Sequence, residues 1–215
     1  NTYLFTIFAI LYFIRVIYKN DILLFHKKAT FMETESIEKE NEREKIEFTH
    51  LHVHTQYSIL DGAADIGKLI AKTKELGMKS IAITDHGNMF GVLQFYNTCL
   101  KNEIKPILGC EMYVSPQSRF IKDGIHFSGH HLILLAKNEK GYKNLIKLNS
   151  LSFAKEAKYR TSRIDEELLF QYAEGLICCS ACLGGVLPKA ISAGRTEEAE
   201  DIAQRYKGVF GEDYY

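Results

Sequence analysis

Short apolar runs alternate with amphipathic segments along residues 48–215. The apolar runs, each bounded by glycine or polar residues, are typical of strands, and the segments between them carry apolar residues at helical spacing. Strands separated by helices require right-handed crossovers, so the pattern predicts an α/β fold with a mainly parallel sheet. Residues 115–129 have the composition of a polar loop or hairpin. We predict strands at 48–54, 79–85, 104–114, 130–136 and 175–181, and helices at 64–77, 91–102, 139–154, 164–175, 184–193 and 196–209.

The first 47 residues have a different pattern. Residues 3–18 are almost entirely apolar and aromatic apart from Arg15, and the run is slightly short for a membrane-spanning helix. Two interpretations of an apolar extension over 1–31 stay open: a membrane or signal-like segment, or mistranslated upstream sequence with Met32 as the true start. Residues 32–47, rich in Glu, are predicted to be a charged linker. The domain itself is then expected at 48–215, cut short at its C-terminus where the chain resembles the entry to another strand.

Composition fits a globular enzyme without an excess of either charge. Of 215 residues, 46% are hydrophobic and 25% are charged, and Lys plus Arg equal Asp plus Glu at 27 each. These values exclude a disordered or fibrous chain, and the net charge of zero excludes nucleic-acid binding through overall basicity. The five cysteines are not spaced as a disulfide framework, which favours a reducing compartment and predicts a cytoplasmic location.

Side chains that bind metals stand at nearly every predicted strand end. In parallel α/β sheets, functional groups collect at the carboxyl ends of the strands. The first strand carries three histidines at period two, which predicts that their imidazoles share one face. In chain order the candidates are His50, His52 and His54, Asp61 before Gly62, His86 in Thr84–Asp85–His86–Gly87, Glu111 after Cys110, His130 and His131, and Cys182 after Cys178–Cys179.

Each of these residues has an ordinary structural explanation when it is taken alone. A histidine pair on a strand is commonly an exposed face, Asp before Gly a turn, and a buried Cys a small core residue. Their coincidence at five successive strand ends indicates a shared metal site instead. Imidazole, carboxylate and thiolate donors suit zinc, manganese or iron better than calcium. So many mixed donors suggest two or three ions that activate water and stabilise an in-line phosphoryl displacement.

Five stretches of the chain resemble the successive motifs of the PHP (polymerase and histidinol phosphatase) domain family. They are 48–66, 77–96, 104–114, 130–148 and 174–185, so the resemblance covers about 48–215. Residues 82–91 and 141–150 favour the version at the amino end of bacterial replicative DNA polymerases over stand-alone phosphoesterases. The resemblance implies a distorted (β/α)7 barrel, incomplete at its C-terminus in this chain, and a cluster of up to three divalent ions of zinc, manganese or iron.

The resemblance also implies roles for individual residues. Catalysis would run through metal held by His52, His54, Asp61, His86 and Glu111, with His131 and Cys182 as further ligands. These are seven of the family's usual nine, and the other two would lie beyond Tyr215. His50 would have a structural role behind the ligands, Arg163 would contact phosphate, and His130 is a weaker candidate than its neighbour.

Three functions follow from this resemblance. The first is the amino-terminal region of a DNA-directed DNA polymerase, a nucleotidyltransferase of DNA replication, with metal-dependent 3′–5′ exonuclease activity. Its partners would be primer-template DNA and other replicase subunits, such as a sliding clamp and a separate proofreading exonuclease, and not a membrane. The alternative is a stand-alone metallo-phosphoesterase that acts on a small phosphate ester. The third is a non-catalytic scaffold that binds structural zinc.

Overall fold

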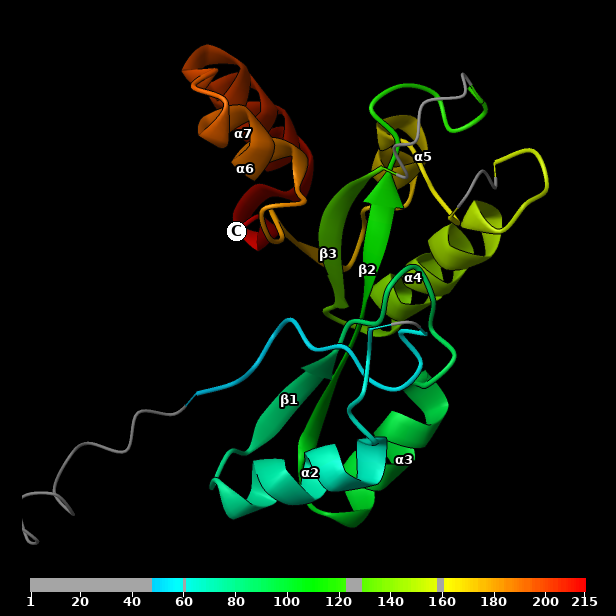
Figure 1. Cartoon of the computed structure of the whole chain (residues 1–215), viewed down its shortest axis with the longest axis vertical. Coiled ribbons are helices and arrows are strands. Elements are labelled where there is room, and N and C mark those ends of the chain that lie inside the picture. The colour runs from blue at the N-terminus through cyan, green and yellow to red at the C-terminus, as the bar shows by residue number, and fades with distance from the viewer. Residues whose placement is uncertain (1–47, 60, 123–128, 158–160) are drawn as a thin grey trace, which may run out of the picture. The chain divides into compact units, whose positions relative to one another are not determined.

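A computed structural model describes residues 48–59, 61–122, 129–157 and 161–215 of the chain (Figure 1). The predicted extension at 1–31 and the charged linker at 32–47 lie outside the described residues. In the part that is described, no helix is both long and apolar enough to cross a membrane.

The alternation of helices and strands predicted from the sequence is confirmed from residue 64 onward. The strands are β1 (Ser80–Ile83), β2 (Lys105–Val114), β3 (His130–Ala136) and β4 (Leu176–Cys179). The helices are α2 (Ile66–Glu75), α3 (Val92–Lys101), α4 (Glu139–Ser152), α5 (Glu166–Gln171), α6 (Val186–Ser192) and α7 (Thr196–Phe210), followed by the 3-10 turn η1 (Gly211–Asp213). Three helices begin where a side-chain oxygen accepts a backbone N–H three residues further on, and these caps are Asp65, Asn138 and Asp165.

The four strands form one sheet in the order β1-β2-β3-β4. β1 and β2 are parallel, whereas β3 is antiparallel to both β2 and β4, so β3 alone runs in the reverse direction. The predicted mainly parallel sheet is therefore wrong for the two pairings that involve β3. A parallel return needs a crossover, usually a helix, and the described residues of the β2–β3 connection, 115–122 and 129, contain none. The α/β class itself is confirmed, and the mixed sheet is consistent with part of the barrel that the resemblance implies.

Residues 48–54 lie beside β1 but do not form the predicted strand. Ala82 N–H donates to the carbonyl of His50, and Thr84 N–H donates to that of Val53, both at 2.9 Å. The two accepting residues, 50 and 53, are three positions apart, whereas the two donating residues, 82 and 84, are two positions apart. The segment therefore contains one extra residue relative to β1, which interrupts regular pairing as in a β-bulge. The extra residue also ends the strict alternation that was expected to put His50, His52 and His54 on one face.

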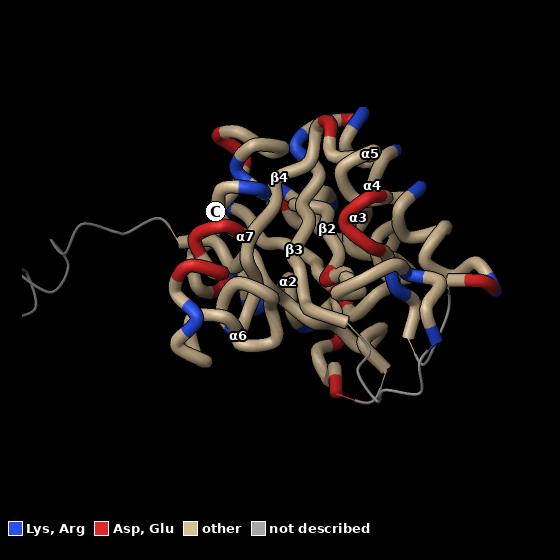
Figure 2. The backbone as a smooth tube through the Cα atoms, turned by 90° about the horizontal axis from the view of Figure 1, so that it is seen from above, with Lys and Arg blue, Asp and Glu red and all other residues tan. Residues whose placement is uncertain are grey.

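Strand alternation divides the sheet into two faces with different contents. Cys110, Met112 and Leu134 belong to the large core cluster that α4, α5 and α7 cover. The opposite face carries a small cluster around Ile133 and Leu135. Glu111 alternates with Cys110 and Met112, so it lies on this second face, away from the large core. Residues of both charges are interspersed along the described chain (Figure 2).

Candidate metal centre

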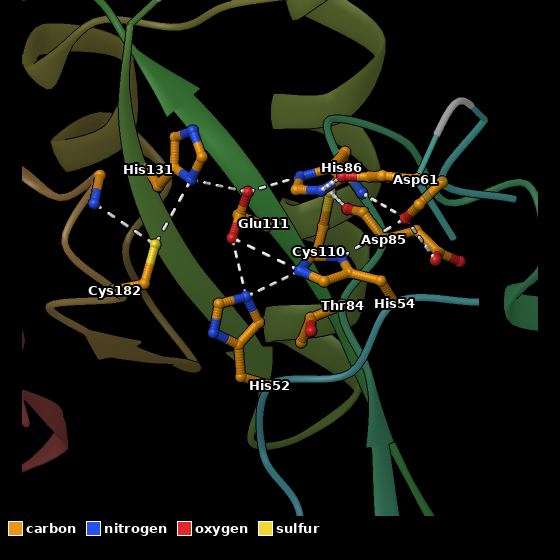
Figure 3. Close-up of polar contacts among 12 residues, drawn as sticks. His52, His54, Asp61, Thr84, Asp85, His86, Cys110, Glu111, His131 and Cys182 are labelled. Carbon is orange, nitrogen blue, oxygen red and sulfur yellow. Dashed lines mark hydrogen bonds and ion pairs between the residues drawn. The ribbon is translucent and has the colours of Figure 1, made fainter. Parts of the chain in front are cut away.

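Glu111 is the central residue of a group of imidazoles (Figure 3). Its side chain is only 1% exposed. One carboxylate oxygen, Oε2, lies 2.7 Å from His52 Nε2. The other, Oε1, lies 2.6 Å from His86 Nδ1 and 3.0 Å from His131 Nδ1. Three histidines from separate parts of the chain therefore contact a single buried carboxylate.

Three further side chains extend this group. His54 Nε2 lies 2.9 Å from His52 Nε2 and 3.8 Å from Glu111 Oε2. On one side Asp61 Oδ2 lies 2.9 Å from His86 Nε2, and on the other Cys182 Sγ lies 3.6 Å from His131 Nδ1. The structure thus brings together the seven residues that the resemblance implies as ligands.

Five of the seven donors form two sets that share Glu111. His52, His54 and Glu111 form one set, and Glu111, His131 and Cys182 form the other; within each, the ligand atoms lie within 4.8 Å of one another. Nitrogen, carboxylate and sulfur donors at this separation suit a borderline divalent ion such as zinc. The residues therefore fit a metal centre.

The reversed strand explains why these residues meet at one edge of the sheet. β1 and β2 carry the chain toward this edge, where an isolated parallel bridge joins His86 to Glu111. β3 runs the other way, so its beginning, at His131, lies at the edge where β1 ends. β4 is antiparallel to β3, so its exit toward Cys182 reaches the same edge.

A buried network of hydrogen bonds holds the backbone that carries His54 and His86. Asp85, 1% exposed, accepts the backbone N–H of Thr55 at 2.6 Å and the hydroxyls of Thr55 and Ser58, both at 2.8 Å. Thr84 Oγ1 accepts the N–H of Val53 at 2.7 Å. Sequence reasoning gave Asp85 no role, and its only signal was its place directly before His86.

Glycine allows the close approach of Cys182 and His131. The His131 N–H donates to the carbonyl of Gly184 at 3.1 Å, and the Gly184 N–H donates to Cys182 Sγ at 3.4 Å. A Cβ on Gly184 would lie 2.9 Å from the Cγ and Nδ1 atoms of His131. A larger residue at position 184 would therefore displace the ring.

The electrostatics of the group favour an ionised Glu111. Burial disfavours the charged carboxylate, but hydrogen bonds with His131, His52 and His86 outweigh it and hold the pKa of Glu111 well below its usual range. The same contact with Glu111 raises the pKa of His86. Burial, together with the neighbouring charge of His86, lowers the pKa of His54.

Three sequence candidates lie outside this group. The His50 ring packs edge-on against Phe48, with 4.8 Å between ring centroids. His130 alternates with His131, lines a cavity on the other face of the sheet, and burial lowers its pKa to about 4. Arg163 is 4% exposed and its guanidinium donates to the carbonyl of Ile121. Its contact with phosphate stays a prediction.

The fold and this site define an α/β protein with a histidine-rich centre able to hold divalent metal. Residues 50–215 match the family described as the PHP domain, and the chain belongs to that family.

Curated relatives give a more particular likeness. The chain is 50% identical to the DNA polymerase III subunit alpha of Treponema pallidum over 174 residues, 80% of this chain and 15% of that protein. It is 52% identical to the same subunit of Borreliella burgdorferi over 170 residues, 78% of this chain and 15% of that protein. The chain thus spans about 15% of the length of these relatives.

The likeness to solved structures is weaker. A proposed metal-dependent phosphoesterase from Bifidobacterium adolescentis has a TM-score of 0.35 and 16% identity, over 48% of this chain and 32% of that one. A likeness at this level carries no weight for function.

Proposed function

We propose that this chain is the PHP region of a DNA polymerase III subunit alpha, the DNA-directed DNA polymerase of replication. Support comes from relatives in several bacterial lineages that bear this name, including one from Aquifex aeolicus at 46% identity. The stand-alone phosphoesterase has less support, because these relatives are 46–52% identical to this chain over the matched residues, which make up about 15% of their own length.

Within this region, the proposed activity is metal-dependent hydrolysis of a phosphodiester at the 3′ end of DNA. The observation that carries it is the convergence of six further donors around Glu111 (Figure 3). Up to three ions of zinc, manganese or iron would be held by His52, His54, Asp61, His86, Glu111, His131 and Cys182. Bound divalent ions supply a nucleophile at neutral pH and offset the charge that develops on phosphate oxygens.

The chain's own residues leave the proposed centre accessible to a substrate from one side. Glu111 is buried beneath the imidazoles, whereas the side chains of His52 and His131 are 33% and 28% exposed. Asp61 is 64% exposed at the margin of the group. A terminal phosphodiester would therefore meet the imidazole side of the centre, while Glu111 fixes the rings from below.

The test combines metal content with a nuclease assay on the 215-residue chain. We expect bound zinc, manganese or iron after dialysis, and metal-dependent removal of a mismatched 3′ nucleotide from a primer-template. His52→Ala should lose both properties, whereas His50→Ala, the matched histidine control outside the group, should keep both.

Other outcomes separate the remaining functions. A metal-loaded chain that leaves mismatched primers intact would contradict the exonuclease activity and favour the scaffold with structural zinc. Faster hydrolysis of a small phosphate monoester than of DNA would favour the phosphoesterase alternative.

Partners and location belong to the same proposal. Primer-template DNA, a sliding clamp and a separate proofreading exonuclease are the partners expected of a replicative polymerase subunit. All five cysteines are free thiols, which supports a reducing compartment and hence the cytoplasm.

A further inference from the structure

Ser58 contacts three residues that belong to the site or support it. Its side chain is 1% exposed, and its hydroxyl donates to Asp85 Oδ1 at 2.8 Å. The hydroxyl oxygen of Ser58 also accepts the backbone N–H of His86 at 3.1 Å and lies 3.4 Å from His54 Nδ1. One hydroxyl therefore contacts both histidine segments and the buried carboxylate that joins them.

The single proton of this hydroxyl decides which atom of His54 carries a hydrogen. A serine hydroxyl has one donor hydrogen and two acceptor lone pairs. The hydrogen is donated to Asp85 Oδ1, which also accepts the backbone N–H of Thr55. The contact with His54 Nδ1 can then be a hydrogen bond only if Nδ1 carries a hydrogen and donates it to Ser58. In a neutral ring, His54 Nε2 is then the unprotonated nitrogen.

The contacts that run from Glu111 through His52 to His54 give the same result. Glu111 Oε2 only accepts, so the 2.7 Å contact requires a hydrogen on His52 Nε2. His54 Nε2, 2.9 Å from that nitrogen, must then face it with a lone pair. Two independent ends, Asp85 and Glu111, thus require the same form of the His54 ring.

We infer that Ser58, oriented by Asp85, is a positioning residue that holds His54 in the form protonated at Nδ1 and leaves Nε2 free to bind metal. The role of Ser58 in metal binding rests on the proposed function. The position of the hydrogen on the His54 ring is a property of the metal-free chain. Neighbouring hydrogen bonds that fix the ring form of a ligand histidine are known to change metal affinity by 10–100-fold.

The test is the nitrogen spectrum of the His54 ring in the metal-free 215-residue chain, at a pH where the ring is neutral. Two-bond hydrogen–nitrogen correlations distinguish a protonated from an unprotonated ring nitrogen. We expect a protonated Nδ1 and an unprotonated Nε2 in the native chain. In Ser58→Ala the two forms should mix, and zinc affinity, measured by competition with a chelator, should fall about 10-fold.

Ser80→Ala is the matched control, because it removes a hydroxyl that contacts Thr49 Oγ1 next to the start of β1. It should leave the His54 spectrum and the zinc affinity unchanged. A hydrogen on His54 Nε2 in the native chain would overturn the inference, and this spectrum decides even if Ser58→Ala does not fold. A chain with the expected spectrum that binds no metal would contradict the proposed function and leave this inference intact.

Discussion

The two sides of Glu111 position their donors in different ways. On one side, His52 and His54 stand on backbone that belongs to no strand or helix, and His86 is joined to β2 only by an isolated bridge to Glu111. On the other side, His131 stands on β3 in register with Tyr113 of β2, so its place relative to Glu111 is fixed by the backbone ladder. A donor on a strand is positioned by the sheet, whereas a donor on irregular backbone needs polar groups built for that purpose.

Asp85 holds the backbone on the irregular side, which is the side of Glu111 that carries His52, His54 and His86. It satisfies two hydroxyls and one backbone N–H that are buried with it. Leaving a buried donor without a partner costs about 1–3 kcal/mol, so such a network is stable only when it is complete. The sheet side, which carries His131 and Cys182, is positioned instead by apolar packing and by the space that Gly184 leaves beside the His131 ring.

The largest effect is expected from Glu111, which both sides share. Glu111→Gln keeps the volume but removes the charge that faces three imidazoles. Zinc affinity should fall by about 100-fold or more, and the free energy of unfolding of the metal-free chain should fall by about 2 kcal/mol. Chelator competition and urea unfolding at pH 6 measure the two quantities. A variant that still binds zinc as tightly as the native chain would contradict the central place of Glu111.

The difference in free energy of unfolding between the native chain and Glu111→Gln should depend on pH. The pKa of Glu111 is lowered in the fold, so its contribution is full above its ordinary value and is lost as pH falls below it. The pKa of His86 is raised, so its contribution is full below 6.5 and is lost as pH rises through the raised value. The difference between native chain and Glu111→Gln should therefore be greatest near pH 5–6 and shrink on both sides. A difference that grows steadily from pH 6 to pH 9 would contradict this pairing.

Asp85→Ala should weaken only the irregular side. Because three buried donors lose their acceptor, we expect a loss of about 3 kcal/mol in the free energy of unfolding and about 10–100-fold in zinc affinity. Hydrogen exchange should accelerate at 53–58 and 84–88, while the β2–β3 ladder stays protected.

Asp165→Ala is the matched control for this prediction. Asp165 is also a buried carboxylate with three donors, namely Arg119 N–H, Arg119 Nη1 and Leu168 N–H, but it caps α5 away from the site. It should cost similar stability and leave zinc affinity unchanged. Equal losses of affinity in the two variants would mean that stability alone, and not position, explains the effect of Asp85.

Gly184→Ala tests the sheet side by crowding instead of by removing a partner. The added methyl group meets the His131 ring at 2.9 Å, so the ring must move, and zinc affinity should fall about 10-fold. Gly208→Ala on α7, where an added methyl group has open space, is the control and should leave affinity unchanged. Equal affinity in the two variants would show that His131 tolerates displacement.

Local signals in the sequence predicted most of the fold. Apolar spacing acts within a few residues, and the elements that it predicts from residue 64 onward appear where they were expected. The direction of β3 was predicted wrongly, because it depends on how the chain returns after Val114 and not on the pattern of the strand itself. The break in pairing at 48–54 was also missed, since an extra residue relative to β1 is visible only once the two segments lie side by side.

The candidate site was predictable in its donors but not in their supports. Histidine, acidic and thiol side chains at successive strand ends are chemically conspicuous, and the seven implied ligands lie together. Ser58 and Asp85 are common turn and cap residues in a sequence, and their importance comes from contacts between segments about 27 residues apart. His50 shows the opposite error, because period two suggested a shared face that the bulge-like break removes.

Cys182 gives the smallest expected effect and the most direct comparison of the two sides. It is exposed, whereas burial raises the pKa of the Cys110 and Cys178 thiols and keeps both unreactive. A maleimide should therefore modify Cys182 first in the native metal-free chain, with no loss of stability, as peptide mass spectrometry will measure. Zinc at 100 times its Kd should slow this reaction about 100-fold, because only the unbound thiol reacts. At the same zinc concentration, Asp85→Ala, which disturbs only the irregular side, should keep part of this protection, about 2- to 10-fold, whereas Glu111→Gln should lose nearly all of it. If Asp85→Ala also abolished protection, the two sides would form one inseparable unit.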